Sequence, residues 1–134
     1  MNEAQTEVLQ QVKERSLTAC KSLGKAILES EKYKKFIDAR DKFRIDDSAK
    51  QAARKYNEAF NEYRMKAQFG ITSPEDKEEI EKLHSAMLEN KTLNDYYSSQ
   101  DNLINFLKEL NVYISNKLNF DFAAFAKPAG GCCG

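Results

Sequence analysis

Apolar residues recur at helical spacing from Leu93 to Leu118, and the steps between them alternate between four and three. This alternation is the heptad pattern of helices that pack lengthwise against one another. As a helix the segment would be roughly 39 Å long at about 1.5 Å per residue. One short neighbour cannot cover that length, so we expect several helices, or a second copy of the chain, to lie along it. The predicted interface positions are Leu93, Tyr97, Gln100, Ile104, Leu107, Asn111, Ile114 and Leu118.

Two positions of this seam are polar, namely Gln100 and Asn111. A buried polar residue in such a seam fixes register and the number of partner helices, at a cost in stability. The alternative is that both residues lie at the rim of the seam. A second apolar row, Tyr96, Leu103 and Leu110, widens the stripe. A single seam of this kind is compatible with either a dimer or a tetramer.

The first half of the chain is expected to form three helices. The first runs from about Asn2 to Glu29, and Gly24 inside it marks a kink, a close helix crossing or a tolerated interruption. Ser30 is a good N-cap for the second helix, and Asp46 or Asp47 for the third. Short polar side chains suit these positions because they accept hydrogen bonds from the free amides of the first turn.

Start and stop signals define two more helices in the second half. Gly70 is expected to end the third helix, and Ser73 followed by Pro74 is the clearest helix start in the chain. Asn90 is expected to end that fourth helix, and Thr92 to cap the last one. No segment shows the alternation of a strand. The sequence therefore predicts an all-α fold, a bundle of about five helices whose long members pack antiparallel, and we expect it to dimerise.

The chain is most simply one helical domain over residues 1–119, followed by a tail over residues 120–134. The tail is first aromatic and then rich in Gly and Cys, and its last part should be flexible. Its phenylalanines, Phe120, Phe122 and Phe125, would be unfavourable in water. We expect them to fold back on their own chain or to pack on the mate of a homodimer.

Composition and charge narrow the classes of partner. The chain carries 21 basic and 21 acidic residues, so no net charge draws it to nucleic acid or to an anionic membrane. The most basic stretch, residues 32–44, interleaves aromatic residues as RNA-contact patches do, but their helical spacing suits the core better. No segment approaches the about 18 apolar residues of a membrane helix. The polar N-terminus has no apolar signal core, so a cytoplasmic protein is expected.

Cys132 and Cys133 are the residues that we single out for chemistry. Thiolates bind soft metals, and an iron–sulfur cluster takes four of them, so this pair would be half of a site that a second chain completes. The alternative is an idle tail, because ligand cysteines usually have residues between them. Cys20, on the first helix, is expected to be a small buried hydrophobe.

Glu81 and His84 match once the Glu-x-x-His spacing of di-iron helical bundles. Such a site needs carboxylates from several helices, so one copy is a weak signal, and His84 is expected at the surface. With one histidine and no Gly-rich phosphate loop, the sequence assigns no catalytic residue.

Four segments, in this order, resemble the YlbF/YmcA family of small helical bacterial regulators. They are Leu23–Tyr33, Asp46–Lys50, Gly70–Glu75 and the final helix Leu93–Leu118. The resemblance covers roughly residues 17–119 and implies an all-α fold that self-associates, usually as a dimer, without catalytic activity. For some members it implies an adaptor role in a complex that influences RNA processing, competence, sporulation and biofilm formation. Cysteine-bearing tails of those members help to hold an iron–sulfur cluster.

Three functional hypotheses follow. The first is a non-enzymatic cytoplasmic adaptor that assembles with itself and with other regulatory proteins, with a cluster shared between chains through Cys132 and Cys133. The second is a metal-dependent helical-bundle enzyme that uses Glu81 and His84. The third is a purely structural self-association domain with an idle tail.

Overall fold

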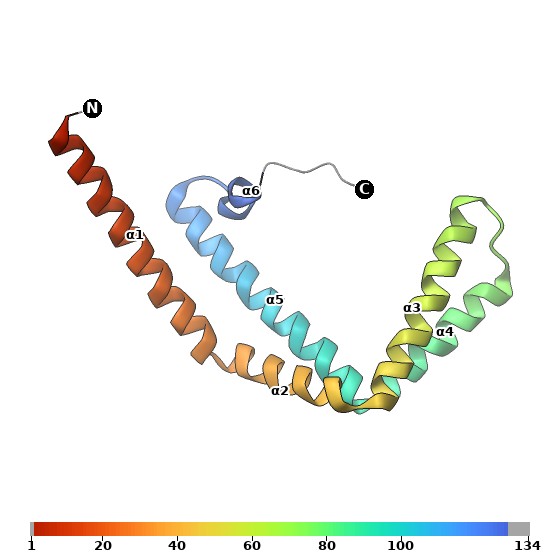
Figure 1. The fold of residues 1–134 in the computed structure, drawn as a ribbon. Helices are drawn as coiled ribbons and strands as arrows, with labels where there is room; N and C mark the ends of the chain where they lie inside the picture. The colour runs from red at the N-terminus through yellow and green to blue at the C-terminus, as the bar shows by residue number, and fades with distance from the viewer. Residues whose placement is uncertain (1, 129–134) are drawn as a thin grey trace.

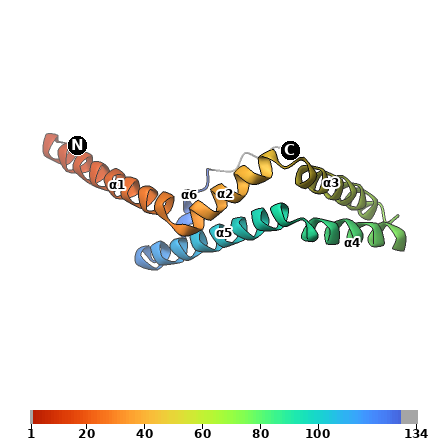
Figure 2. The same cartoon turned by 90° about the horizontal axis from the view of Figure 1, so that it is seen from below.

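A computed structural model of the chain describes residues 2–128, which form six helices and no strand. The helices are α1 (Glu3–Glu29), α2 (Glu31–Ile45), α3 (Asp47–Gln68), α4 (Pro74–Glu89), α5 (Lys91–Leu118) and α6 (Phe122–Ala126). The predicted all-α bundle is confirmed. Helix α2 runs antiparallel to α5, and α3 antiparallel to α4 (Figure 1). These two pairs meet at one corner, while α1 leads away from the opposite end of α2 (Figures 1 and 2).

Three connections between helices are single residues that end one helix and begin the next. Ser30 joins α1 to α2, Asp46 joins α2 to α3, and Asn90 joins α4 to α5. The side-chain oxygen of each accepts a hydrogen bond from the backbone amide three residues later, at 3.0–3.3 Å. The caps at Ser30 and Asp46 are confirmed. The prediction that Thr92 caps the last helix is wrong, because Asn90 has the extended backbone of a cap and α5 already begins at Lys91.

The turn between α3 and α4 is closed by backbone and side-chain hydrogen bonds. Gly70 has a left-handed backbone with φ of +67°, and the amide of Ile71 donates to the carbonyl of Lys66 at 3.1 Å. The hydroxyl of Ser73 accepts from the amide of Asp76 at 3.2 Å, and Pro74 stands at the first helical position as predicted. The ammonium of Lys66 donates to Asp76 at 2.7 Å. This bond, followed by that from the Ser73 amide, lowers the pKa of the Asp76 carboxyl to about 2.

The core lies at the corner where α2, α3, α4 and α5 meet. Its fully or nearly buried apolar side chains are Ala49, Ala53, Met87 and Leu93. The small alanines of α3 allow the other helices to approach its backbone closely. Around them pack Phe43, Ala52, Tyr56 and Tyr97. The buried set is small for a chain of this length, so most apolar side chains of the long helices remain outside it.

Helix α1 has no buried residue and contacts only α2 among the helices that the structure describes. The expectation that Cys20 is buried is therefore wrong, because no other helix of residues 2–128 covers this part of α1. The helix runs through Gly24 without interruption, and a Cβ added there would meet no atom within 4 Å. Within the single chain, Gly24 is thus a tolerated interruption and not a close crossing.

Candidate interaction surface

Helices α2, α3 and α4 cover the predicted seam on α5 over its first half only. Helix α2 has 15 residues and α5 has 28, so α5 extends roughly 20 Å beyond its neighbour at about 1.5 Å per residue. Leu93 has no exposed surface, whereas Ile104 and Leu107 are each 41% exposed and Leu118 is 44% exposed. The same stripe is therefore core at one end and surface at the other.

The inner end of the seam serves the core of this chain. Tyr97 packs against the cluster around Leu93. Burial raises the pKa of the Tyr97 hydroxyl, and the nearby Tyr96 and Tyr56 raise it further. Gln100, one turn on, is half-buried. Leu93 has no surface left to offer to another chain, so the predicted interface positions that remain accessible lie further along α5.

Asn111 has a role that the heptad pattern did not indicate. Its side-chain oxygen accepts a hydrogen bond from the amide of Ala123 at 3.1 Å, and the hydroxyl of Ser115 accepts from the amide of Phe122 at 2.9 Å. Both bonds satisfy free amides at the start of α6. Asn119, in the left-handed region with φ of 59°, reverses the chain between α5 and α6. Asn111 and Ser115 are four residues apart on α5, and this spacing was the only sequence signal for the contact. By itself it does not predict which group the two side chains bind.

The aromatic segment folds back on its own chain, which was one of the two expected outcomes. Helix α6 lies against the end of α5 (Figure 1). The rings of Phe120 and Phe125 lie 5.0 Å apart between centroids. All three phenylalanines of this segment nevertheless remain exposed. Together with the exposed members of the α5 stripe they form a set of exposed apolar side chains at this end of the molecule. We call it the outer surface: Ile104, Leu107, Leu118, Phe120, Phe122 and Phe125.

Helix α1 carries a second exposed apolar region. At 100° per residue its large apolar side chains fall within an arc of roughly 200°. Every charged residue of the helix except Lys13 falls on the opposite side. We call this region the α1 apolar face, and its exposed members are Val8, Leu9, Val12, Leu17, Leu23 and Leu28.

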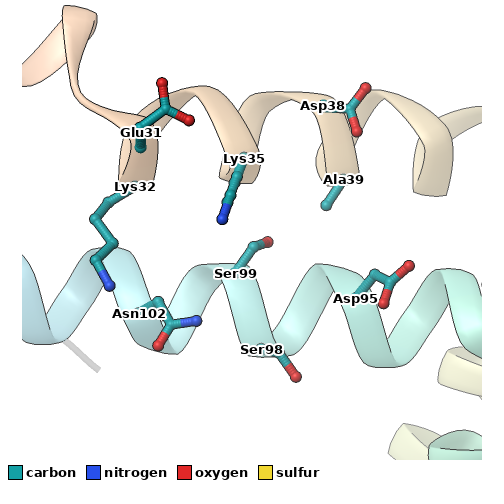
Figure 3. Close-up of a pocket in the computed structure, with 9 residues that line it drawn as sticks. All are labelled: Glu31, Lys32, Lys35, Asp38, Ala39, Asp95, Ser98, Ser99 and Asn102. Carbon is teal, nitrogen blue, oxygen red and sulfur yellow. The ribbon is translucent and has the colours of Figure 1, made fainter.

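A polar groove runs between α2 and α5 (Figure 3). It encloses about 450 Å³ and is lined by Glu31, Lys32, Lys35, Asp38, Ala39, Asp95, Ser98, Ser99 and Asn102. Figure 3 shows Lys32 and Lys35 of α2 reaching toward Asn102 and Ser99 of α5. Asp38 is paired with Lys42 at 2.7 Å, a contact that raises the pKa of that lysine. The lining mixes both signs of charge, and the hydroxyl of Ser99 donates to the carbonyl of Tyr96 at 2.9 Å, so the groove suits contact with a polar surface better than catalysis.

Two aromatic residues of the basic stretch, Phe36 and Phe43, pack against α5, as expected. Phe43 stacks on Tyr96 of α5 with ring centroids 4.9 Å apart, and Phe36 lies on the same ring at 6.0 Å. Rings engaged in this way do not offer a face for stacking nucleic-acid bases.

The residues proposed for metal chemistry are not brought together. Glu81 and His84 are both exposed on α4, as predicted for His84, whose ring lies 5.6 Å from that of Tyr56. Residues 2–128 contain no group of three or more His, Cys, Asp or Glu side chains that could hold a metal ion. Cys132 and Cys133 lie outside the described residues.

Within the described part, no helix is both long and apolar enough to cross a membrane.

Comparison with known proteins identifies the family. No curated protein matches the chain. Among solved structures it is similar to RicA of Bacillus subtilis, crystallised in complex with RicF. The two share 21% identity with a TM-score of 0.63, over 78% of this chain and 94% of that chain, which shows a common fold. Residues 17–119 match the family described as "Control of competence regulator ComK, YlbF/YmcA". Because this match spans most of the sequence, the chain belongs to the YlbF/YmcA family.

Proposed function

We propose that this protein is a non-enzymatic regulatory adaptor that associates with itself and binds other regulatory proteins. The observation that carries the proposal is the unburied apolar surface of its two longest helices. The solvent-accessible surface area of the chain is 10871 Å², whereas that of a compact folded chain of 15.4 kDa is about 7,200 Å². Large continuous apolar regions on a protein surface mark contact sites for other proteins.

The comparisons support a regulatory role carried out through protein partners. The family is described by its control of a competence regulator, and RicA was crystallised with a protein partner. We extend this to the present chain and propose a helical regulatory protein as its partner. By the family resemblance, the resulting complex would influence RNA processing and developmental regulation in the cytoplasm.

We further propose that Cys132 and Cys133 supply thiolates to an iron–sulfur cluster shared between chains. A cluster takes four thiolates, and this chain has three cysteines, of which Cys20 is on α1. The donors of one chain therefore do not complete a site, whereas two tails, or one tail and a cysteine-bearing partner, would. When bound, the cluster would make the assembly dependent on iron supply.

Co-purification tests the adaptor function. Tagged protein from cell extract is expected to elute with a second copy and with a protein partner. Leu107→Asp on the outer surface should reduce the amount of bound protein, because it places a charge where apolar contact is expected. Leu88→Asp is the matched control, since Leu88 is similarly exposed but lies on α4, away from both apolar regions. A wild-type chain that elutes alone would contradict the proposal.

Purification without oxygen tests the cluster. Iron per chain and visible absorption are expected in the wild type and should be lost together in Cys132→Ser with Cys133→Ser. Iron that survives in that variant would contradict the assignment to the tail.

A further inference from the structure

We infer that α1 of a second copy covers the outer surface of α5 and α6, and that two copies exchange their first helices reciprocally. The inference rests on the self-association proposed above and adds which segments meet. The heptad pattern placed the interface on α5 alone. In the structure, the larger unburied apolar arc belongs to α1, which contacts only α2 among the described helices.

The chain holds its own α1 away from α5. At the joint, the amide of Ser30 donates to the carbonyl of Ile27 at 3.1 Å, and its carbonyl accepts from the amide of Lys34 at 3.1 Å. The Ser30 side chain caps α2 as well. A joint of one residue with these groups engaged fixes the direction of α1, which diverges from the outer half of α5 when the molecule is seen from below (Figure 2). The helix that reaches the outer surface therefore comes from another molecule.

The α1 apolar face is wide enough for two neighbours. A helix that packs on a single surface needs an apolar stripe of about 100°, and the arc on α1 is roughly twice that. In a reciprocal exchange each α1 meets the outer surface of the other copy and, beside it, the α1 of that copy. The four helices, two α1 and two α5, then enclose one shared core.

The α1 apolar face is long enough to cover the outer surface. From Val8 to Leu28 it advances 20 residues along α1, or roughly 30 Å. Ile104 to Leu118 spans 14 residues of α5, or roughly 21 Å. Helix α6 then adds its exposed phenylalanines beside the end of this span.

The charges favour an antiparallel arrangement. Residues 3–12 of α1 carry only acidic charges, Glu3 and Glu7, and residues 18–28 carry only basic ones, Lys21 and Lys25. On α5, Asp101 stands just before Ile104, and Lys117 stands at the other end of the outer surface. The charged residues of α1 lie outside its apolar arc, so these charges would meet only at the margins of the contact, where antiparallel helices bring Glu7 near Lys117 and Lys21 near Asp101.

The available area is sufficient for a stable dimer. Each chain exposes roughly 3,700 Å² more than a compact chain of its mass would. Obligate homodimer interfaces bury about 2,000–5,000 Å² in total, which is about 1,000–2,500 Å² from each chain. The first half of α1 also precedes the family match, which begins at residue 17. This part of the proposed contact is therefore a feature of the present chain beyond the matched region.

Light-scattering mass tests whether α1 is the contact. The wild type is expected at twice 15.4 kDa, and Val12→Asp with Leu23→Asp at 15.4 kDa. Gln11→Asp with Ser22→Asp is the matched control, with the same added charge and the same spacing on the polar side of α1, and it should remain a dimer. Circular dichroism checks that the helices persist, as expected because α1 has no buried residue. A Val12→Asp, Leu23→Asp variant that stays dimeric overturns the inference but leaves the adaptor function standing.

Disulfide cross-linking tests which chain covers α5, and in which direction. Single cysteines are placed in a background with Cys20→Ser, Cys132→Ser and Cys133→Ser, and differently tagged proteins are mixed. Val8→Cys mixed with Leu118→Cys should give a cross-linked dimer. Leu23→Cys mixed with Leu118→Cys should not, because Leu23 lies roughly 22 Å further along α1.

The cross-linking outcomes separate the alternatives. A parallel arrangement would reverse the two mixed results and overturn the inference. Val8→Cys and Leu118→Cys placed in one chain would give a disulfide within a monomer if α1 closed on its own α5, and that result would also overturn it. A wild-type chain that is monomeric in solution would remove both this inference and the self-association in the proposed function.

Discussion

Helix α5 carries one apolar stripe through two different surroundings. At its first turns Leu93 is fully enclosed, where α2, α3, α4 and α5 meet. Two heptads later Leu107 occupies the equivalent position with two fifths of its surface in water. The residue type and the spacing are the same, so the difference comes from the neighbours that the chain supplies. The corner is completed within one molecule, whereas the outer half of α5 and the whole of α1 are not.

The largest expected effect comes from removing the centre of the corner. Leu93→Ala should lower the free energy of unfolding by about 2–5 kcal/mol, because it leaves a cavity among side chains that cannot close around it. Leu88→Ala, at a position 52% exposed on α4, should cost less than about 1 kcal/mol. Urea unfolding followed by circular dichroism measures both. Equal losses would mean that the corner is not the stabilising core.

A second contrast uses one substitution at two glycines. Gly70→Ala should destabilise the chain by about 1 kcal/mol, because φ of +67° strains any residue with a Cβ. Gly24→Ala should instead stabilise α1 by about 0.5–1 kcal/mol, since an added Cβ meets nothing within 4 Å in the single chain. Thermal unfolding of the two variants should shift in opposite directions. A Gly24→Ala variant with weakened dimerisation would place a close helix crossing at Gly24 between chains.

A smaller, local effect is expected where α6 is tied to α5. Asn111→Ala removes the acceptor of the Ala123 amide and should weaken the start of α6 by about 1 kcal/mol. Amide hydrogen exchange at Phe122 and Ala123 should accelerate roughly fivefold, while exchange in the corner is unchanged. Asn116→Ala, on an exposed position of the same helix, is the control. Unchanged exchange at Ala123 would show that α6 is held by its phenylalanines alone.

The smallest effect concerns the ion pair at the tip of the α3–α4 hairpin. The pKa of Asp76 in the folded chain is about 2, below its ordinary value of 3.8. Its ionised form therefore contributes stability above pH 3.8 that is lost as the pH falls toward 2. In Asp76→Asn the thermal midpoint should be lower at neutral pH, and the gap to the wild type should close over that interval. A gap that stays constant down to pH 2 would exclude the carboxylate as its cause.

Local chemistry explains which features could be read from the sequence. Helix starts at Ser30, Asp46 and Ser73 depend on a side chain and an amide three residues away, so a short window contains all of the information. Asn90 was correctly predicted to end α4, but the cap of α5 was predicted two residues too late, at Thr92, because Asn90 serves both as the end of α4 and as the start of α5.

Structural features that depend on residues far away in the sequence could not be predicted from the hydrophobic pattern. Cys20 was expected to be buried because its type favours burial, but nothing in the sequence showed that α1 has no neighbour in its own chain beyond α2. Asn111 binds an amide 12 residues later, and only the reversal at Asn119 brings that amide within reach. The seam on α5 was correctly placed as an apolar stripe, whereas its division into core and surface followed from the short length of α2.

The single-residue joints have a consequence for how such a protein can change over evolutionary time. Each helical residue rotates the chain by about 100° about the helix axis. One residue inserted at Ser30 would therefore turn the α1 apolar face toward a different direction relative to the rest of the chain. The same insertion would leave the corner around Leu93 untouched, because α1 contributes nothing to it. Under the contact that we infer for α1, the residues that set this contact are separate from those that stabilise the corner. A single-residue insertion or deletion at the joint would then change the contact between copies and leave the corner intact.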